Sequence, residues 1–243
     1  LFSCLFDIVL KTEVKRAKPN WQLVNDFCDL VKPENLKTDC RTIEVVRKGK
    51  KRPMELASDK EKWFAYKTKA LFKLGKFQES YGLSKMALES FSKFHYSNDI
   101  WFARRIALAK RNLGAVTEAI KELEEILKRK KEWFIQKELA ELYLESGDIE
   151  KAFKLSLAAI NNYGDLEYKI DLLFLMGEIL KAKGEDELAF KHYSLSRLIR
   201  IKMEWKVVNK LEVALGQFKR ENIAIEMITP LKDELHIYWL SFK

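Results

Sequence analysis

The most informative absence in this sequence is proline. Only 4 prolines occur in 243 residues, and none lies between residues 54 and 229. Proline disrupts a helix interior because it lacks an amide hydrogen and its ring clashes with the preceding turn. Glycine is also scarce, at 9 residues. A long proline-free segment with few glycines therefore indicates long helices.

Cysteines and long apolar runs are scarce as well. The three cysteines, Cys4, Cys28 and Cys40, are irregularly spaced and form no CxxC pair, so we expect no disulfide framework and a cytoplasmic, reducing environment. No apolar run reaches the roughly 18–20 residues that a membrane-spanning helix needs, so we expect no membrane partner. The sequence begins at Leu1 and stops abruptly at YWLSFK, which leads us to expect a longer parent protein.

Groups that could perform catalysis are few and scattered. The sequence has no glycine-rich phosphate loop, and its histidines, His95, His192 and His236, lie far apart with no second ligand at metal spacing. A Ser-x-x-Lys match at residues 90–93 lacks the companion motifs of penicillin-type sites. We predict a protein that is not an enzyme, with no catalytic residues, no metal and no cofactor.

Against these absences, a repeat runs through the proline-free segment. Glycine recurs in the stretches FKLGKFQES, RNLGAVTEA, LESGDIEKA and KAKGEDELA, at spacings of 39, 33 and 37 residues. A small residue follows each glycine by five positions. Such a period indicates antiparallel helix hairpins, in which glycine takes the left-handed conformation that ends the first helix. The glycines are Gly75, Gly114, Gly147 and Gly184, and the small residues are Ser80, Ala119, Ala152 and Ala189.

The pattern resembles the tetratricopeptide repeat family. In residues 133–160, the family's small, aromatic, turn and small positions are occupied by Ala140, Tyr143, Gly147, Ala152 and Ala159. Residues 172–196 fit nearly as well, and residues 61–88 and 100–127 fit less closely. The resemblance implies an all-α, right-handed solenoid of about four repeats with capping helices at both ends.

The flanks of the repeats also carry helical patterns. We expect an N-terminal helical cap and basic connector over residues 1–57, four repeats over 58–199 and a C-terminal capping hairpin over 200–243. Asn20 is a candidate helix cap, and Ser58 and Glu61 have the spacing of a capping box. Asp148 is placed to cap the second helix of the third repeat.

The resemblance also implies a binding surface. In this family the first helices of successive hairpins line a concave groove, and the corresponding positions here are cationic in the first two repeats and mixed to acidic afterwards. Ala65 and Lys69 stand where chaperone-binding members have lysine and asparagine, so we do not expect a cochaperone. The candidate partner-binding residues are Lys62, Lys69, Phe72, Lys73, Trp101, Arg104, Arg111 and Asn112.

A basic run, VRKGKKRPM at residues 46–54, precedes the first repeat. Gly49 and Pro53 predict a turn or loop there, which is either a solvated connector or an extension of the anion-binding surface. Its cations are Arg47, Lys48, Lys50, Lys51 and Arg52.

The net charge of +9 favours anionic partners. The predicted function is a protein-interaction scaffold that binds a protein or acidic peptide in its groove. The alternative is a nucleic-acid-binding helical-repeat protein that takes RNA or DNA. A third reading is that the groove charges only solvate the helices. Homo-oligomer formation is left open.

Overall fold

The computed structural model describes residues 2–47 and 49–242, with the side chains of residues 2–5 and 47 outside the description. Over these residues the chain forms twelve α-helices, three short 3-10 helices and one two-stranded sheet. Its contacts divide into two compact units, Leu1–Glu122 and Leu123–Lys243. Among the residues described, no helix is both long enough and apolar enough to cross a membrane.

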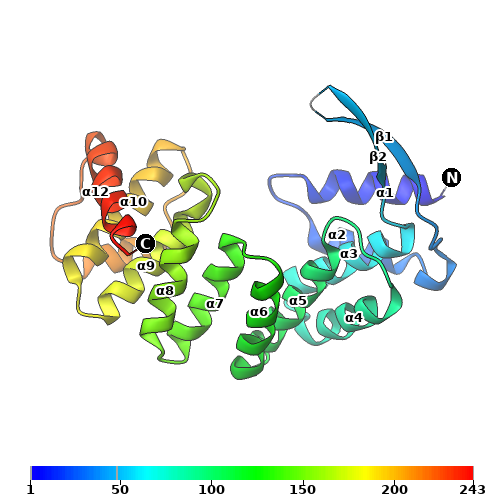
Figure 1. Ribbon diagram of the computed structural model, residues 1–243, viewed down its shortest axis with the longest axis horizontal. Coiled ribbons are helices and arrows are strands. Elements are labelled where there is room, and N and C mark those ends of the chain that lie inside the picture. The colour runs from blue at the N-terminus through cyan, green and yellow to red at the C-terminus, as the bar shows by residue number, and fades with distance from the viewer. Residues whose placement is uncertain (1, 48, 243) are drawn as a thin grey trace. The chain divides into compact units, whose positions relative to one another are not determined.

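The first unit begins with two helices that cover the first repeat, as predicted (Figure 1). The side chain of Asn20 accepts a hydrogen bond from the amide of Leu23 (3.0 Å), and that of Ser58 accepts one from Glu61 (3.1 Å), so both predicted caps are confirmed. The helices are α1 (Phe2–Val14), α2 (Trp21–Asp29), α3 (Asp59–Lys73), α4 (Phe77–Ser90), α5 (Asn98–Asn112) and α6 (Val116–Arg129), with a 3-10 turn at Pro33–Asn35. The boundary between the units falls within α6.

The basic run lies in a β-hairpin: the predicted turn is present at Gly49, but the predicted loop is wrong, because residues 46–47 and 50–54 belong to strands. Strands β1 (Thr42–Arg47) and β2 (Lys50–Glu55) pair antiparallel, with Thr42 opposite Glu55 and Val46 opposite Lys51. Gly49 in the turn has φ of +73°. Figure 1 shows the hairpin extending away from the helices of the first unit. The β-branched residues of TIEVVR favour a strand, and the glycine after them favours a hairpin turn.

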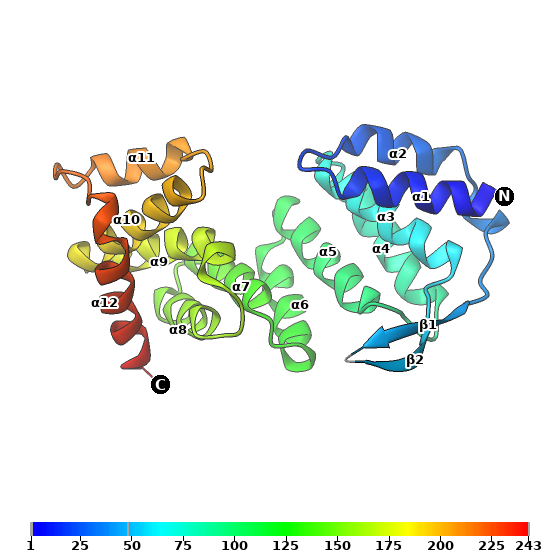
Figure 2. The same cartoon turned by 90° about the horizontal axis from the view of Figure 1, so that it is seen from above.

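The second unit continues the paired-helix pattern. Helix α7 packs on α8 and α9 on α10, and both α11 and α12 pack on α10 (Figure 2). The predicted cap Asp148 is confirmed, because its carboxylate accepts the amide of Lys151 (3.1 Å). The helices are α7 (Trp133–Glu145), α8 (Ile149–Ile160), α9 (Ile170–Ala182), α10 (Asp186–Lys202), α11 (Asn209–Gly216) and α12 (Ile228–Leu240), with 3-10 turns at Leu166–Lys169 and Ile225–Met227.

The four repeat turns share one geometry. Each turn glycine has a φ between +75° and +88° and donates its amide to the carbonyl three residues earlier. The next residue donates its amide to the carbonyl five residues earlier, as Lys76 does to Leu71 (2.9 Å) and Asp148 to Tyr143 (2.9 Å). This is the Schellman motif, which satisfies the last carbonyls of the helix. The predicted role of these glycines is therefore confirmed.

The small positions lie in the core, as the repeat pattern predicts. The residues five positions after the glycines, Ser80, Ala119, Ala152 and Ala189, are completely buried. In the first unit the core also joins the N-terminal helices to the first repeat, because Phe6, Val24 and Cys28 pack with Phe64. The indole of Trp63 donates to the carbonyl of Cys28 (2.9 Å).

Candidate functional site

A cavity of about 410 Å³ opens in the first unit beside helices α1, α3 and α5. Four of its lining side chains are cationic, three are aromatic side chains of the first two repeats, and none of the residues described in its wall is acidic. The lining residues are Val14, Ala65, Tyr66, Lys69, Phe72, Lys73, Asn98, Trp101, Arg104 and Arg105.

Helical spacing brings these side chains to one wall. On α3, Lys69 is followed at the third and fourth positions by Phe72 and Lys73. On α5, Trp101 is followed by Arg104 and Arg105 with the same spacing. Residues three and four apart lie on one face of a helix, so each helix presents an aromatic group among cations.

Arg105 is the unusual member of this wall. Its side chain is only 8% exposed, and its guanidinium stacks on the ring of Phe102. It makes one long hydrogen bond, 3.5 Å to the carbonyl of Ala65, and its Nε has no partner among the described residues. Burial, assisted by the charge of Arg104, lowers the pKa of Arg105 to about 9. At neutral pH the group therefore stays charged, at a cost on the order of 5 kcal/mol.

The other cations add to this unfavourable charge. Burial lowers the pKa of Lys69, and the positive charges of Arg105, Lys73 and Arg104 lower it further. The ammonium of Lys69 lies over the ring of Trp21, 5.2 Å from its centroid, and this contact offsets part of the cost. Like charges held close together repel each other, and an anion placed among them would relieve this repulsion.

The structure brings five of the eight predicted partner-binding residues into this wall: Lys69, Phe72, Lys73, Trp101 and Arg104. Lys62 lies elsewhere, because helix α1 covers the start of α3 and Asp7 of α1 pairs with Lys62 at 3.2 Å. Arg111 and Asn112 come too late on α5 to line the cavity, and the side-chain amide of Asn112 donates to the carbonyl of Leu108 (2.7 Å). The binding role of all eight residues stays a prediction.

Several wall residues were missed by the sequence analysis. Arg105 lies four positions after Trp101 and seven after Asn98, so helical periodicity applied to Trp101 predicts both. Tyr66 is adjacent to the predicted groove position Ala65. Val14 comes from α1, and only the packing of α1 on α3 brings it to the cavity.

The predicted anion-binding run is separate from the cavity wall. Lys50, Lys51 and Arg52 are exposed on β2, and Lys51 forms an exposed ion pair with Glu44 at 3.2 Å. None of these three lines the cavity as described. Lys48 and the side chain of Arg47 lie outside the described part of the chain.

Solved structures share this fold at low sequence identity. MamA (residues 41 to the end) from Desulfovibrio magneticus RS-1 has a TM-score of 0.57 and 13% identity, covering 82% of this chain and 96% of MamA. BtubC (BKLC) from P. vanneervenii has a TM-score of 0.52 and 12% identity, and the match covers 85% of this chain and 74% of BtubC. YrrB, described as a TPR protein with an unusual peptide-binding site, has a TM-score of 0.50 and 12% identity. The match covers 66% of this chain and 75% of YrrB.

Comparison with protein-family models and with curated proteins finds no match. The structural neighbours, together with the four repeated hairpins and their glycine turns, show that the chain has the tetratricopeptide-repeat fold, an all-α array of paired helices. The resemblance predicted from the sequence is confirmed at the level of the fold. The ligand has to be inferred from the site itself.

Proposed function

We propose that this protein is a non-catalytic interaction module that binds an acidic segment of a partner protein in the cavity beside α3 and α5. The observation that carries the proposal is Arg105, a buried guanidinium with an unpartnered Nε and no carboxylate within ion-pair distance among the described residues. Buried charges are ordinarily paired, so the missing partner points to a carboxylate from another molecule.

The chemistry of the wall fits a carboxylate in an apolar setting. A guanidinium holds a carboxylate through two parallel hydrogen bonds, which gives both strength and orientation. Lys69, Lys73 and Arg104 surround that position with further positive charge. Phe72 and Trp101 offer apolar contact to the residues that flank the acidic side chain. A structural neighbour of the same fold is described as peptide-binding, which supports a peptide as the ligand.

Binding is tested with a fluorescein-labelled peptide of alternating glutamate and leucine, and with a matched peptide in which glutamine replaces glutamate. On titration with the protein, we expect the fluorescence anisotropy of the acidic peptide to rise and that of the glutamine peptide to stay unchanged. Arg105→Met should weaken that binding at least roughly tenfold, because truncating a buried charge partner costs about 2–5 kcal/mol. Equal binding of the two peptides would contradict the proposal.

The second unit offers a matched control, Arg200→Met. Arg200 is as buried as Arg105 and also has an unpartnered Nε, but its guanidinium pairs with Asp171 at 2.7 Å. This variant should bind the acidic peptide like the wild type. Labelled single-stranded RNA tests the nucleic-acid alternative. If the protein bound RNA but not the acidic peptide, and if its affinity for RNA fell steeply with salt, the peptide proposal would be overturned.

The same two variants separate a binding residue from a structural one. Replacing an uncompensated buried charge with an apolar side chain of similar length is neutral or stabilising, so urea denaturation of Arg105→Met should show a free energy of unfolding equal to or about 1–2 kcal/mol above the wild type. Arg200→Met should lower it, because an existing ion pair is lost. A large loss of stability in Arg105→Met would show that Arg105 serves the fold.

A further inference from the structure

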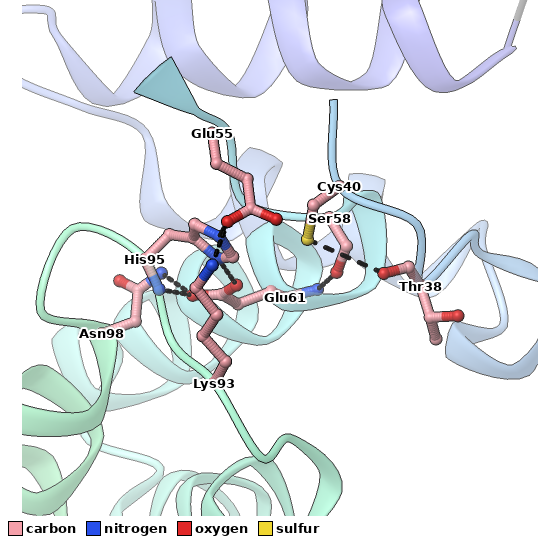
Figure 3. Close-up of polar contacts among 8 residues, drawn as sticks. All are labelled: Thr38, Cys40, Glu55, Ser58, Glu61, Lys93, His95 and Asn98. Carbon is pink, nitrogen blue, oxygen red and sulfur yellow. Dashed lines mark hydrogen bonds and ion pairs between the residues drawn. The ribbon is translucent and has the colours of Figure 1, made fainter. Parts of the chain in front are cut away.

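A second polar cluster of the first unit joins three segments that are distant in the sequence. It contains Cys40, which precedes β1, Glu55 at the end of β2 and His95 in the connection from α4 to α5 (Figure 3). Figure 3 shows the three side chains converging beside Glu61 of α3. One ligand atom from each, a sulfur, a carboxylate oxygen and a ring nitrogen, lies within 4.8 Å of the other two.

Glu61 fixes the ring of His95. This carboxylate is 1% exposed and accepts from the His95 amide (2.9 Å), the Asn98 side chain (2.8 Å) and His95 Nδ1 (2.8 Å). The predicted capping box is therefore only half formed: Ser58 caps α3, while Glu61 turns toward His95. Because Nδ1 donates to Glu61, the ring orientation is set and Nε2 points the other way.

Nε2 of His95 is buried and makes no well-formed hydrogen bond among the described residues; its one polar neighbour there is a long contact with Glu55. It faces Glu55, whose Oε2 lies 3.4 Å away, and Cys40 completes the group. The hydrogen bonds from Nδ1 and the backbone amide of His95 to Glu61 are sufficient to hold this residue in the fold, so a purely structural role does not require Nε2. A carboxylate that holds one ring nitrogen, with the second nitrogen turned toward further ligand atoms, is the arrangement that metal-ligating histidines adopt.

We propose that Cys40, Glu55 and His95 form a binding site for a divalent transition-metal ion, with zinc as the metal that this ligand set fits. Thiolate sulfur, imidazole nitrogen and carboxylate oxygen are the three donor types that zinc takes. Ligand atoms lie about 2.0–2.3 Å from zinc, which puts tetrahedral ligands roughly 3.5 Å apart. Glu55 and His95 already have this separation. The sulfur of the exposed Cys40 lies within 4.8 Å of both atoms, and metal binding would draw it closer.

The charges also fit a dication. A Cys40 thiolate and the Glu55 carboxylate together carry two negative charges, which a zinc ion neutralises. Glu55 now contacts the ammonium of Lys93, which is 69% exposed and can move into solvent when a metal takes its place. Three protein ligands leave the fourth position to water. No metal is predicted from the sequence, because Cys40, Glu55 and His95 have no recognisable spacing.

The site would fasten the β-hairpin to the helices. Cys40 and Glu55 stand at the two ends of the hairpin base, and His95 belongs to the helical body. In the described residues the strands have their main contacts with each other. A metal ion bound here therefore anchors an element that packing alone holds weakly.

The test is a cobalt titration of the reduced, untagged full chain after removal of metals with a chelator. We expect CoCl₂ to bind at one equivalent and to give a thiolate-to-cobalt charge-transfer band in the near ultraviolet. ZnCl₂ should displace the cobalt, because zinc binds such sites more tightly. Absence of saturable binding, or binding without the thiolate band, would overturn the proposal.

Variants assign the ligands. Cys40→Ser should abolish the thiolate band and Glu55→Gln should weaken zinc binding at least tenfold, while Glu61→Gln should weaken it by roughly 10–100-fold through the ring of His95. Cys28→Ala and Glu44→Gln are matched controls, a buried cysteine of α2 and an exposed glutamate of β1, and both should bind like the wild type. An unchanged cobalt spectrum in Cys40→Ser would contradict the assignment.

Hydrogen exchange provides a readout that does not depend on the cobalt spectrum. In the wild type, ZnCl₂ should slow amide exchange at the hairpin base, around Thr42 and Glu55, and it should have no such effect in Cys40→Ser. Equal exchange with and without zinc in the wild type would show that the ion does not fasten the hairpin.

Discussion

At the scale of single residues, the buried cations show how unusual Arg105 is. Lys67 is satisfied by Asp29 and by the side chain of Asn25, and Lys169 by the carbonyls of Ile160 and Asn162. Arg200 pairs with Asp171. Each of these groups recovers the cost of leaving water through charged or strong hydrogen bonds. Arg105 contacts only the distant carbonyl of Ala65 and the Phe102 ring, so its positive charge in the cavity is not neutralised by an anion of the described residues.

His192 differs from Arg105 because both of its ring nitrogens have hydrogen-bond partners, and these partners suit only the neutral ring. Its Nδ1 donates to the carbonyl of Leu188 (2.7 Å), and its Nε2 accepts from the indole of Trp239 (2.9 Å). Complete burial lowers the pKa of His192 to about 4. The contact with Trp239 joins α12 to α10, so protonation of this ring would break the docking of the last helix.

This setting predicts a pH dependence of stability. Between pH 6.5 and pH 4 the unfolded chain binds a proton at His192 that the folded chain does not, so the stabilisation is complete above pH 6.5 and is lost as the pH falls toward 4. We expect the free energy of unfolding in urea to be about 2 kcal/mol lower at pH 5 than at pH 7.

His192→Gln should remove most of this difference, whatever its stability at pH 7, while His236→Gln, a change at an exposed histidine, should retain it. If His192→Gln lost as much stability as the wild type between the two pH values, another group would be responsible.

At the scale of elements, two paired helices approach closely where Gly177 of α9 faces Tyr193 of α10. A Cβ at Gly177 would stand 2.6 Å from Cδ1 and 2.8 Å from Cζ of the Tyr193 ring. This tyrosine is fully buried, and its hydroxyl donates to Glu178, so the ring has no free space into which it can move. The glycine therefore sets the distance between the two helices.

Gly177→Ala should consequently destabilise the protein by about 1–3 kcal/mol, since overpacking outweighs the better helix propensity of alanine. Gly82→Ala is the matched control, because Gly82 lies within α4 and a Cβ there meets nothing within 4 Å. That change should raise the free energy of unfolding by about 0.5–1 kcal/mol. Urea denaturation measures both, and equal effects of the two substitutions would contradict the packing argument.

The elements also show what the sequence can predict. Turn glycines, small core positions and the caps at Asn20, Ser58 and Asp148 follow from local chemistry, and each was predicted. The orientation of Glu61 was not, because its partners His95 and Asn98 lie more than thirty residues away. The hairpin was missed for a different reason: Pro53 and the dense charge of residues 47–52 concealed the alternation in TIEVVR. The position of Lys62 outside the cavity wall could not be predicted, because the packing of α1 on α3 is a tertiary feature.

At the scale of the whole molecule, the net positive charge is confined to one unit. Residues 1–122 hold 25 Lys and Arg against 15 Asp and Glu, whereas residues 123–243 hold 20 against 21. The net charge of +9 therefore comes entirely from the unit that contains both the cavity and the hairpin. A field of this sign attracts acidic ligands over a distance of about 10 Å at 0.1 M salt.

The cavity and the hairpin should affect binding through different rate constants. Cations that steer a ligand raise the association rate, whereas a buried partner of the bound charge slows dissociation. Lys50, Lys51 and Arg52 are exposed and lie outside the cavity wall, so replacing all three with glutamine should lower the association rate of the acidic peptide several-fold at low salt. Arg105→Met should instead raise its dissociation rate.

Stopped-flow fluorescence measures both rate constants. The matched control is the triple change of Lys202, Lys206 and Lys219 to glutamine, which removes the same charge from exposed positions of the second unit. It should leave the association rate near that of the wild type, and the hairpin variant should show the weaker dependence of that rate on salt. If the two triple variants behaved alike, or if the hairpin variant bound as fast as the wild type, the basic run would be a solvated connector with no part in capturing the ligand.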